Sequence, residues 1–299
     1  MLSHSDFWIW DSWYVDDGTF FHAFFLQAPR SLIDPDKRHL NATVGHARSL
    51  NLIDWEYLGT AFMPSENGFD NQAIWTGCIV RDEKDQWHFF YTGISKKDLS
   101  SVQRIGHAVS KDLNQWERLP GPILESDARW YQQRDDVSPP DQPFRDPWVF
   151  KFQDKWHMVI TSNLRNGSEN HRATMAHAIS TDLFNWEIQE PLINSETHFR
   201  QMEVFQIEKI NQECVAIFCM NETDVNRSDI DAKTATYWMP AESPLGPFHF
   251  EKAQPIKEQI YAGRLIKDRD GIWKLLGFVN VAADGKFGGY ICKIGRAHV

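Results

Sequence analysis

The chain has 299 residues and a formal net charge of −10. This length is large for one ordinary domain, but single all-β barrels and propellers reach it. The acidic balance argues against a nucleic-acid partner and against an acidic membrane surface, since both require a basic face. We find no stretch apolar and long enough to cross a bilayer as a helix. The four Cys residues show no CxxC spacing, which indicates free buried thiols rather than a disulfide framework.

The N-terminal residues do not have the pattern of a signal peptide, because Trp8 to Trp13 already has the composition of a structural strand. We therefore expect the chain as given to be cytoplasmic. The sequence contains 13 Trp and 20 Phe. Most of them suit the core of a β-rich protein. The others are candidates for stacking on sugar rings.

An internal repeat organises the chain, and its three clearest copies share a small-His-Ala motif. The histidines are His46, His107 and His177, and a Trp follows each of them nine residues later. A polar turn between two apolar or aromatic runs, typical of a β-hairpin, precedes each copy and recurs twice more downstream. The units of this repeat open near residues 8, 73, 144, 202 and 260.

Each unit has the pattern of four antiparallel strands, and such units are the blades of a β-propeller. We therefore predict an all-β fold, a single five-bladed β-propeller over residues 1–299. The fifth blade looks short, because no fourth strand follows Gly289–Lys293. Residues 294–299 do not fit the repeat and match the translation of a common sequencing-adapter sequence. We expect them to be a non-native tail, and the natural chain to continue beyond Lys293.

Three long polar inserts interrupt the repeat, at Ala28–His39, Glu125–Gln142 and Asn221–Lys233. Loops of this length in a compact domain are usually functional or disordered. The second insert contains Trp130, Tyr131 and Arg134, and we expect it to cover the rim of a pocket.

The first strand of each propeller blade lines the central axis, so residues far apart in the sequence converge there. This arrangement places Asp11, Trp75, Asp146, Glu203 and Tyr261 around one funnel. Cleavage of a glycosidic bond needs two carboxyl groups, one of which stays protonated to donate to the leaving oxygen. Glu203 lies in an apolar stretch, where loss of solvent raises the pKa of a carboxyl group, and this suits the acid.

Asp11 lies among three tryptophans, with Ser12 as a potential hydrogen-bond donor, which suits an ionised nucleophile. The charge of Arg145 is expected to keep Asp146 ionised, so that this carboxylate can bind sugar hydroxyls and stabilise oxocarbenium charge. Each acid alone also has a structural interpretation, as a turn residue, a member of an ion pair or a buried acid held by a base. Because Asp11, Asp146 and Glu203 occur at equivalent points of three repeats, we favour a glycosidase site.

The three motif histidines could in principle be ligands of a metal ion. They occupy the same repeat position in three separate blades, however, on third strands away from the axis. We expect structural histidines that bond to a neighbouring blade, with no metal and no cofactor. The Asp-rich hairpin turns are too short to be calcium loops.

These motifs resemble those of the five-bladed glycoside hydrolases of families 32 and 68, the invertases, fructanases and levansucrases. Trp10-Asp11-Ser12-Trp13 is similar to the levansucrase nucleophile motif, and Phe144-Arg145-Asp146-Pro147 to the Arg-Asp-Pro motif of both families. Ile74-Trp75-Thr76-Gly77 resembles their Trp-Ser-Gly element. The acid/base motif departs from the pattern, because Glu203-Val204 stands in place of Glu-Cys or Glu-x-Glu-Arg.

The resemblance implies Asp11 as nucleophile, Asp146 as transition-state stabiliser and Glu203 as acid/base, with retention through a fructosyl-enzyme intermediate. Five further residues are expected to bind the substrate: Trp10, Trp75, Thr76, Arg145 and Tyr261. The expected substrate is a β-fructoside such as sucrose or a fructan, with hydrolysis or fructosyl transfer as the reaction. The oligomeric state is left open.

Two other interpretations stay open. An arabinan- or xylan-active enzyme resembling glycoside hydrolase family 43 also carries three acids on this fold but inverts. Carboxyl separation distinguishes the two, at about 5–5.5 Å for retention and about 6.5–9.5 Å for inversion. A non-catalytic sugar-binding propeller would bind sucrose without turnover. The Trp-Asp-Ser-Trp and Arg-Asp-Pro motifs favour the fructosidase.

Overall fold

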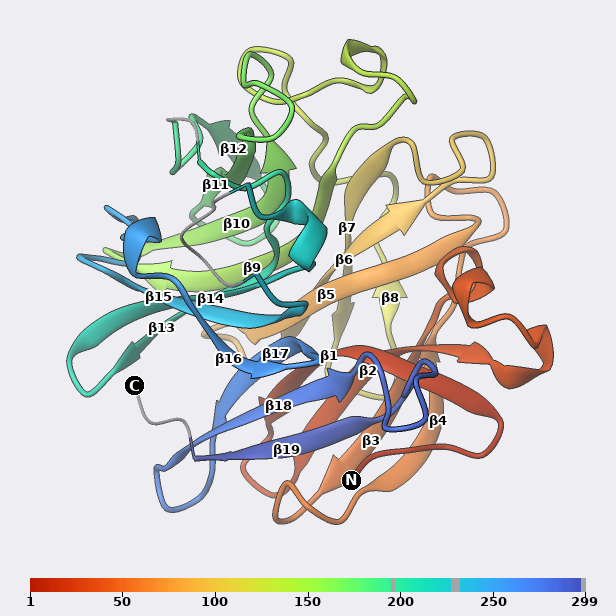
Figure 1. Cartoon of the computed structure of the whole chain (residues 1–299). Helices are drawn as coiled ribbons and strands as arrows, with labels where there is room; N and C mark the ends of the chain where they lie inside the picture. Colours follow the sequence, from red (N-terminus) through yellow and green to blue (C-terminus); the bar gives the residue numbers. More distant parts are fainter. Residues whose placement is uncertain (195–196, 227–231, 297–299) are drawn as a thin grey trace.

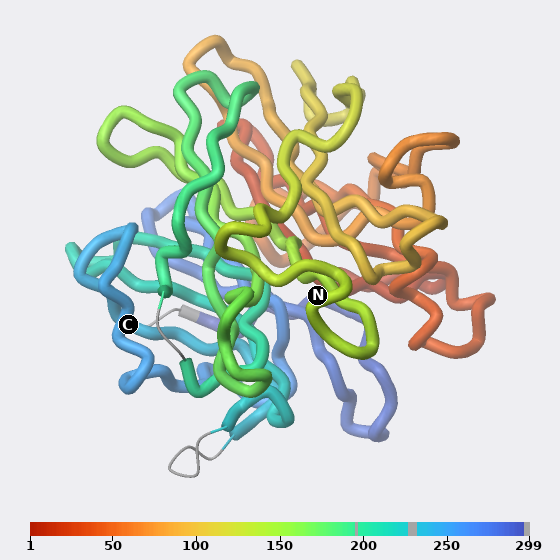
Figure 2. The backbone as a smooth tube through the Cα atoms, turned by 90° about the horizontal axis from the view of Figure 1, so that it is seen from above, coloured from red at the N-terminus to blue at the C-terminus, as the bar shows by residue number. Residues whose placement is uncertain are grey.

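The computed structural model describes residues 1–194, 197–226 and 232–296. Five antiparallel sheets are arranged around a central axis (Figure 1). The first strand of each sheet contacts the first strands of its two neighbours, which closes the ring. The predicted five-bladed β-propeller is therefore confirmed. The same radial arrangement, with long loops crossing one end, is visible from above in Figure 2.

Each blade is built from consecutive strands. Blade one contains β1 (Phe7–Asp16), β2 (Phe21–Pro29), β3 (Thr43–Ser49) and β4 (Glu56–Phe62). Blade two contains β5 (Ala73–Arg81), β6 (Trp87–Ile94), β7 (Gln103–Ser110) and β8 (Glu117–Arg118). Blade three contains β9 (Phe144–Phe152), β10 (Lys155–Asn163), β11 (Ala173–Ser180) and β12 (Trp186–Gln189). Blade four contains β13 (Glu203–Ile210), β14 (Glu213–Met220), β15 (Ala235–Ala241) and β16 (Gln254–Glu258).

Blade five has three described strands, β17 (Ile260–Lys267), β18 (Trp273–Val279) and β19 (Ile291–Arg296), so it is short as predicted. The strand β19 continues through Arg296 and pairs with β18, which means that residues 294–296 do follow the repeat. The expectation that they lie outside it is wrong in this respect. Residues 297–299 lie outside the described part of the chain, and the foreign origin of the tail stays a prediction.

The N-terminal segment joins the fifth blade. The backbone of Leu2 pairs with Ile291 through two hydrogen bonds of 3.0 and 2.9 Å. The amide of Ile9 also donates to the carbonyl of Gly289 at 3.0 Å. The two ends of the described chain thus meet on one sheet.

Aromatic side chains fill the space between blades, as expected for most of them. Trp13 of blade one stacks on Phe89 of blade two, with ring centroids 5.5 Å apart. Trp116 packs edge-on against Phe24 across the same interface, at 5.9 Å. Such pairs add to the free energy gained by burying their large apolar surface. Three of the four Cys residues are buried as free thiols.

The motif histidines have a different partner from the one predicted. His46, His107 and His177 each bond to a histidine of the second strand in the same blade, namely His22, His88 and His157. The nitrogen–nitrogen distances are 2.8, 3.0 and 2.9 Å, and the paired rings are stacked. The prediction of bonds to a neighbouring blade is therefore wrong. Blades four and five have no histidines at these two positions. The equivalent residues are Val215 and Trp238 in blade four, and Lys274 and Lys293 in blade five.

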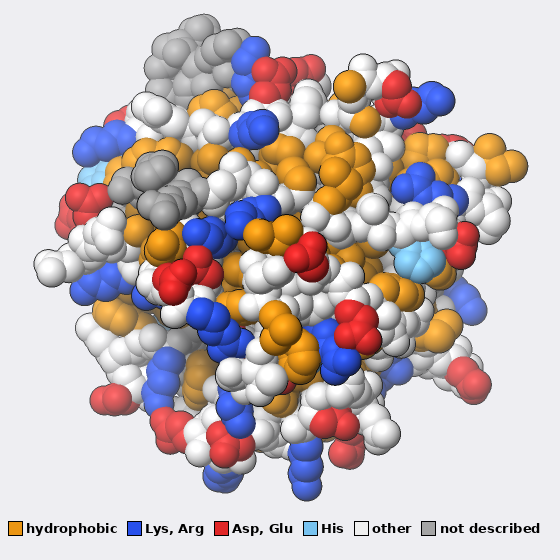
Figure 3. Space-filling view, turned by 90° about the horizontal axis from the view of Figure 1, so that it is seen from below, with side chains coloured by type: hydrophobic (Ala, Val, Ile, Leu, Met, Phe, Trp, Pro, Cys, Tyr) orange, Lys and Arg blue, Asp and Glu red, His pale blue; other side chains and the backbone are white. Residues whose placement is uncertain are grey.

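On the face seen in Figure 3, acidic and basic side chains are interspersed rather than gathered in separate areas. Among the described residues, no helix is long and apolar enough to cross a membrane. Short 3₁₀ turns occur in the inserts, of which Pro35–Asn41 contributes to the site. The third predicted insert, Asn221–Lys233, falls partly outside the described residues.

Candidate active site

A β-bulge interrupts the first strand of every blade. Opposite its partner strand, each first strand carries one extra residue, at Asp11, Thr76, Asp146–Pro147, Val204–Phe205 and Ala262–Gly263. Bulges bend a strand and redirect the side chain at the irregular position. The repeat therefore produces five redirected positions around one axis.

The bulges also define which residues are equivalent. Asp11 and Asp146 lie at the bulge itself, whereas Glu203 lies one residue before it, at the position of Arg145 and Tyr261. The prediction that all three acids occupy equivalent points is therefore wrong for Glu203. Its carboxylate approaches the axis from a different level of the strand than the other two.

Three bulge residues have left-handed backbones although none of them is glycine. The φ angles are 57° at Asp146, 56° at Val204 and 47° at Ala262. Such conformations cost about 1–3 kcal/mol each and persist where the surroundings hold them. Here the amide of Asp146 donates to the Thr92 hydroxyl at 2.9 Å, and that of Val204 donates to the Asp146 carboxylate at 3.3 Å. Hydrogen bonds between adjacent blades thus hold the strained positions.

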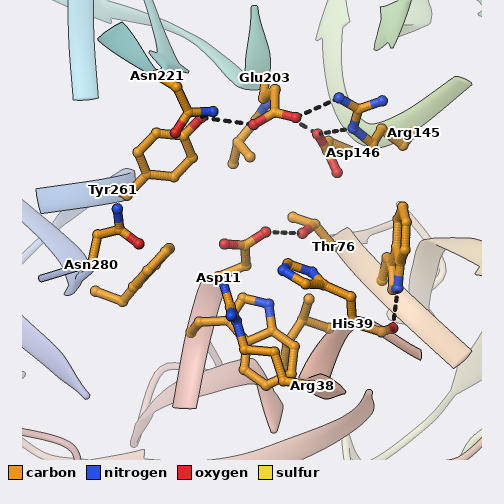
Figure 4. Close-up of a pocket in the computed structure, with 15 residues that line it drawn as sticks. Asp11, Arg38, His39, Thr76, Arg145, Asp146, Glu203, Asn221, Tyr261 and Asn280 are labelled. Carbon is orange, nitrogen blue, oxygen red and sulfur yellow. Dashed lines mark hydrogen bonds and ion pairs between the residues drawn. The ribbon is translucent and has the colours of Figure 1, made fainter. Parts of the chain in front are cut away.

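The bulges surround a cavity of about 280 Å³ on the axis. All eight residues predicted for catalysis or substrate binding line it: Trp10, Asp11, Trp75, Thr76, Arg145, Asp146, Glu203 and Tyr261. In Figure 4, Asp11 lies opposite Glu203 across the cavity, and Asp146 lies beside Arg145 at one end. The convergence expected from the repeat is therefore present in the structure.

Asp11 accepts a hydrogen bond from the hydroxyl of Thr76 on the neighbouring blade. Ser12 does not serve this purpose, because its hydroxyl bonds to the Tyr14 hydroxyl at 2.7 Å. Burial raises the pKa of Asp11 to about 6, and the charge of Glu203 adds to this rise, while the bond from Thr76 opposes it. The carboxylate is thus mostly ionised at neutral pH, with a donor different from the predicted one.

Asp146 is 3% exposed and accepts hydrogen bonds from Thr161, at 3.1 Å, and from the Val204 amide. Burial raises its pKa to about 7, although the charge of Arg145 acts in the opposite direction. The prediction that Arg145 keeps Asp146 ionised is therefore wrong. The nearest contact between their charged groups is 3.6 Å, because the guanidinium is turned toward another partner.

That partner is Glu203, which forms an ion pair with Arg145 and accepts a hydrogen bond of 2.7 Å from the Tyr261 hydroxyl. Burial opposes ionisation of Glu203, but Arg145 and Tyr261 outweigh it and lower the pKa of the carboxyl group. The predicted rise of this pKa is wrong. The apolar neighbours in the sequence lie along the strand, whereas the side chain points toward polar groups from two other blades.

Four polar lining residues were missed by the sequence analysis: Arg38, His39, Asn221 and Asn280. Arg38 and His39 come from the 3₁₀ turn Pro35–Asn41 in the first insert, whose length was the available signal. Trp75 fixes this turn by donating from its indole nitrogen to the His39 carbonyl at 2.7 Å. Burial lowers the pKa of His39 to about 4, so its ring is neutral at neutral pH.

The second insert does not cover this cavity. Trp130, Tyr131 and Arg134 are absent from its lining, which corrects the predicted rim. Tyr131 is instead fully buried and donates to the Gln189 carbonyl at 2.7 Å, which fastens the insert to blade three. Among the described residues, no group of three or more His, Cys, Asp or Glu side chains is arranged to hold a metal ion.

A five-bladed propeller with three carboxylates in its axial cavity has the architecture of the propeller glycoside hydrolases. The family model described as "Glycosyl hydrolases family 32 N-terminal domain" matches residues 13–284. The chain belongs to this family, and the resemblance noted in its motifs is confirmed. Asp11 lies two residues before the matched span.

Individual relatives are more distant. The chain is 26% identical over 172 residues to a probable sucrose-6-phosphate hydrolase of Vibrio cholerae, covering 57% of this chain and 28% of that protein. It thus spans less than a third of that relative's length.

Two solved structures show the same fold. An inulosucrase from Halalkalicoccus jeotgali bound to kestose has a TM-score of 0.81 at 19% identity, over 97% of this chain and 86% of its own. A Bombyx mori GH32 beta-fructofuranosidase has a TM-score of 0.72 at 23% identity, over 97% of this chain and 60% of its own.

Proposed function

We propose that this chain is a retaining glycoside hydrolase that cleaves β-fructosides such as sucrose or fructans. The observation that carries the proposal is the placement of Asp11 and Glu203 on opposite sides of one axial cavity, with Asp146 beside them. Membership of family 32 and the names of the relatives support the substrate class. The aromatic lining from Trp10 and Trp75 suits a sugar ring.

Asp11 is the proposed nucleophile. Its carboxylate attacks the anomeric carbon of the fructosyl unit and forms a covalent ester, while the bond to the leaving oxygen breaks. The Thr76 hydroxyl holds one carboxylate oxygen and leaves the other for attack. Since its pKa is about 6, Asp11 is charged at neutral pH and less strongly solvated than a surface aspartate.

Glu203 is the proposed acid/base, and it needs a proton that it does not hold in the free site. Asp146, with a pKa of about 7, carries a proton in a sizeable fraction of molecules near neutral pH. Sugar hydroxyls that donate hydrogen bonds to Asp146 favour its ionised form. We propose that substrate binding therefore moves this proton to Glu203, which donates it to the leaving oxygen.

The second half of the reaction reverses these roles. Glu203, now ionised again, removes a proton from water, and the water oxygen attacks the anomeric carbon and releases Asp11. The ionised Asp146 stabilises the positive charge that develops on the fructosyl ring in both transition states. A sugar hydroxyl in place of water would give fructosyl transfer.

The proposal is tested with sucrose, sucrose 6-phosphate, raffinose, inulin and levan, followed by product analysis. Release of fructose or of a fructosyl oligosaccharide is expected from at least one of them. With methanol as an added acceptor, retention gives the methyl β-fructoside, whereas the methyl α-fructoside would indicate inversion of the kind seen in family 43. Calorimetric binding of these sugars without any product would contradict the proposal and favour a sugar-binding propeller.

The remaining expectations stay predictions of this proposal. They are a cytoplasmic location, a single catalytic domain, and action on a small carbohydrate without a cofactor or a nucleic-acid or membrane partner. The specific roles of the substrate-binding residues, among them Tyr261 and Arg145, belong to the same proposal.

A further inference from the structure

Beyond the cavity-lining residues, the first strands form a second layer of side chains. Each of its members lies three positions after the residue that precedes the bulge of its strand. Its members share the same register opposite the second strands and are Trp13, Cys78, Trp148, Gln206 and Arg264. Four of them are apolar or neutral. Arg264 is the charged member, and it is 1% exposed.

The contacts of Arg264 leave much of its guanidinium unpaired. One terminal nitrogen donates to the backbone carbonyls of Val204, at 3.3 Å, and Phe205. The guanidinium also lies over the ring of Trp148, 5.0 Å from its centroid. Its Nε and second terminal nitrogen have no hydrogen-bond partner. Burying a charge in this way is costly unless other charges compensate it.

Two of the groups that act on Arg264, Asp11 and Asp146, line the cavity. The titratable groups whose charges act on Arg264, or on which its charge acts, come from five strands: Asp11, Tyr14, Cys78, Asp146, Glu208 and Cys219. Arg264 lowers the pKa of both Asp11 and Asp146. With Arg38 and Arg145 in the lining, the site and its floor hold three guanidiniums for three carboxylates.

We propose that Arg264 is a positioning residue of the active site with two effects. It holds the Val204–Phe205 bulge that follows Glu203, and its charge next to the cavity favours the ionised forms of Asp11 and Asp146. It does not contact the substrate, since it lines none of the cavity. This inference rests on the proposed glycosidase function and identifies a residue on which that function depends.

Three substitutions separate the two effects. Arg264→Met removes both the charge and the hydrogen-bond donors. Arg264→Gln keeps an amide donor but removes the charge. Arg264→Lys keeps the charge but loses the planar arrangement of donors of the guanidinium. Loss of a nearby buried charge is expected to move the acidic limb of the kcat/KM profile upward by about one pH unit in the Met and Gln variants. In the Lys variant the limb stays near its wild-type position, and kcat falls because the bulge is held less firmly.

Loss of Arg264 should affect kcat more than KM. We expect kcat of Arg264→Met to fall at least about tenfold at neutral pH, with KM changed less than about threefold, because the substrate contacts remain. The matched control is Arg118→Met. Arg118 also lies over an aromatic ring, that of Phe62 at 4.2 Å, but it pairs with Asp70 away from the cavity. This control is expected to lose stability without any shift of the pH profile.

A second readout does not require activity. In protein labelled with ¹³C at the aspartate carboxyl carbons, the signals of Asp11 and Asp146 are assigned from Asp11→Asn and Asp146→Asn. Their titration should move to higher pH in the folded Arg264→Gln variant, even if none of the fructosides proves to be a substrate. Unchanged carboxyl titration and an unchanged acidic limb in a folded neutral variant would overturn the proposal. Should Arg264→Met fail to fold, Arg264→Gln decides the matter.

Discussion

The inner wall and the blade flanks of this propeller use the same repeat in opposite ways. On the flanks of blades one to three, equivalent positions carry the same pair of stacked, hydrogen-bonded histidines. At the equivalent bulges of the inner wall the side chains differ from blade to blade, with aspartates in blades one and three, Thr76 in blade two and Val204 in blade four. Repetition thus provides blade geometry, and divergence at the bulge provides chemistry.

The two regions also differ in their response to acid. Burial lowers the pKa of His46 and His107 to about 3, so the flanks favour neutral side chains. Burial raises the pKa of Asp11 to about 6 and that of Asp146 to about 7, so these two positions of the inner wall favour protonated carboxyl groups. Both effects have the same cause, which is the cost of a buried charge. Their consequences for stability have opposite signs.

The largest expected effect is on catalysis at the inner wall. Glu203→Gln and Asp11→Asn should each lower kcat by about 10⁴-fold or more, because each removes a group that forms or breaks a bond. Product release from the most active fructoside measures this loss. Glu208→Gln, on the same strand but outside the cavity, is the matched control and should keep its activity. Activity near the wild-type level in either site variant would refute the assignment.

The next effect concerns the acid sensitivity of the flanks. A histidine whose folded pKa is depressed favours folding above its unfolded pKa, near 6.5, and this contribution is lost as the pH falls toward the folded value. Replacing one pair by apolar residues, as in His88→Leu/His107→Leu, should therefore reduce the loss of stability between pH 7 and pH 4 by about 2–3 kcal/mol. Urea unfolding at both pH values measures it.

An unchanged dependence on pH in that double variant would show that the buried pair does not titrate as inferred. The wild-type chain measured in the same buffers serves as the reference. The comparison must be between chains, because Asp11 and Asp146 contribute a dependence of the opposite sign in both.

A smaller effect is expected when only one member of a pair is removed. His107→Leu leaves His88 Nδ1 buried without its partner, which should lower the free energy of unfolding by about 2 kcal/mol at pH 7. The catalytic constants should stay close to the wild type, since the pair lies outside the cavity. A fall in kcat with unchanged stability would contradict the separation of flank and inner wall.

The smallest effect is a gain in stability at the inner wall. A carboxyl group with a raised folded pKa costs stability as the pH rises through that value. Asp11→Asn should therefore raise the free energy of unfolding by about 1 kcal/mol at pH 8, partly offset by the altered bond to Thr76. The gain should vanish at about pH 3, where Asp11 is mostly neutral in both the folded and the unfolded state. Thermal unfolding at the two pH values checks this sign.

Much of the architecture is predictable because each blade repeats its spacing. The openings near residues 8, 73, 144, 202 and 260 agree within one residue with the strand starts at Phe7, Ala73, Phe144, Glu203 and Ile260. The offset of Glu203 was not predictable, since it depends on the register between β13 and β14 around the bulge. A neighbour in the sequence is a poor guide to electrostatics at such a position.

The pKa directions illustrate the same limit. Arg145 is adjacent to Asp146 in the sequence, yet its guanidinium pairs with Glu203, 58 residues away. The histidine pairs were not predicted for a related reason. The partners of the three motif histidines lie 24, 19 and 20 residues upstream, and loops of different length set these separations. Side-chain direction and loop length, rather than strand pattern, decided these contacts.

The pairing of Leu2 with Ile291 has a consequence for how this protein is made. These residues are 289 positions apart, so the contact forms only after almost all of the described chain has left the ribosome. The earlier blades can form from local hairpins as they emerge, whereas the N-terminal segment has to wait with its backbone unpaired. Contacts of such long sequence separation are slow to form. We therefore expect ring closure, rather than blade formation, to limit the rate of refolding, with acquisition of activity lagging behind the gain of β-structure.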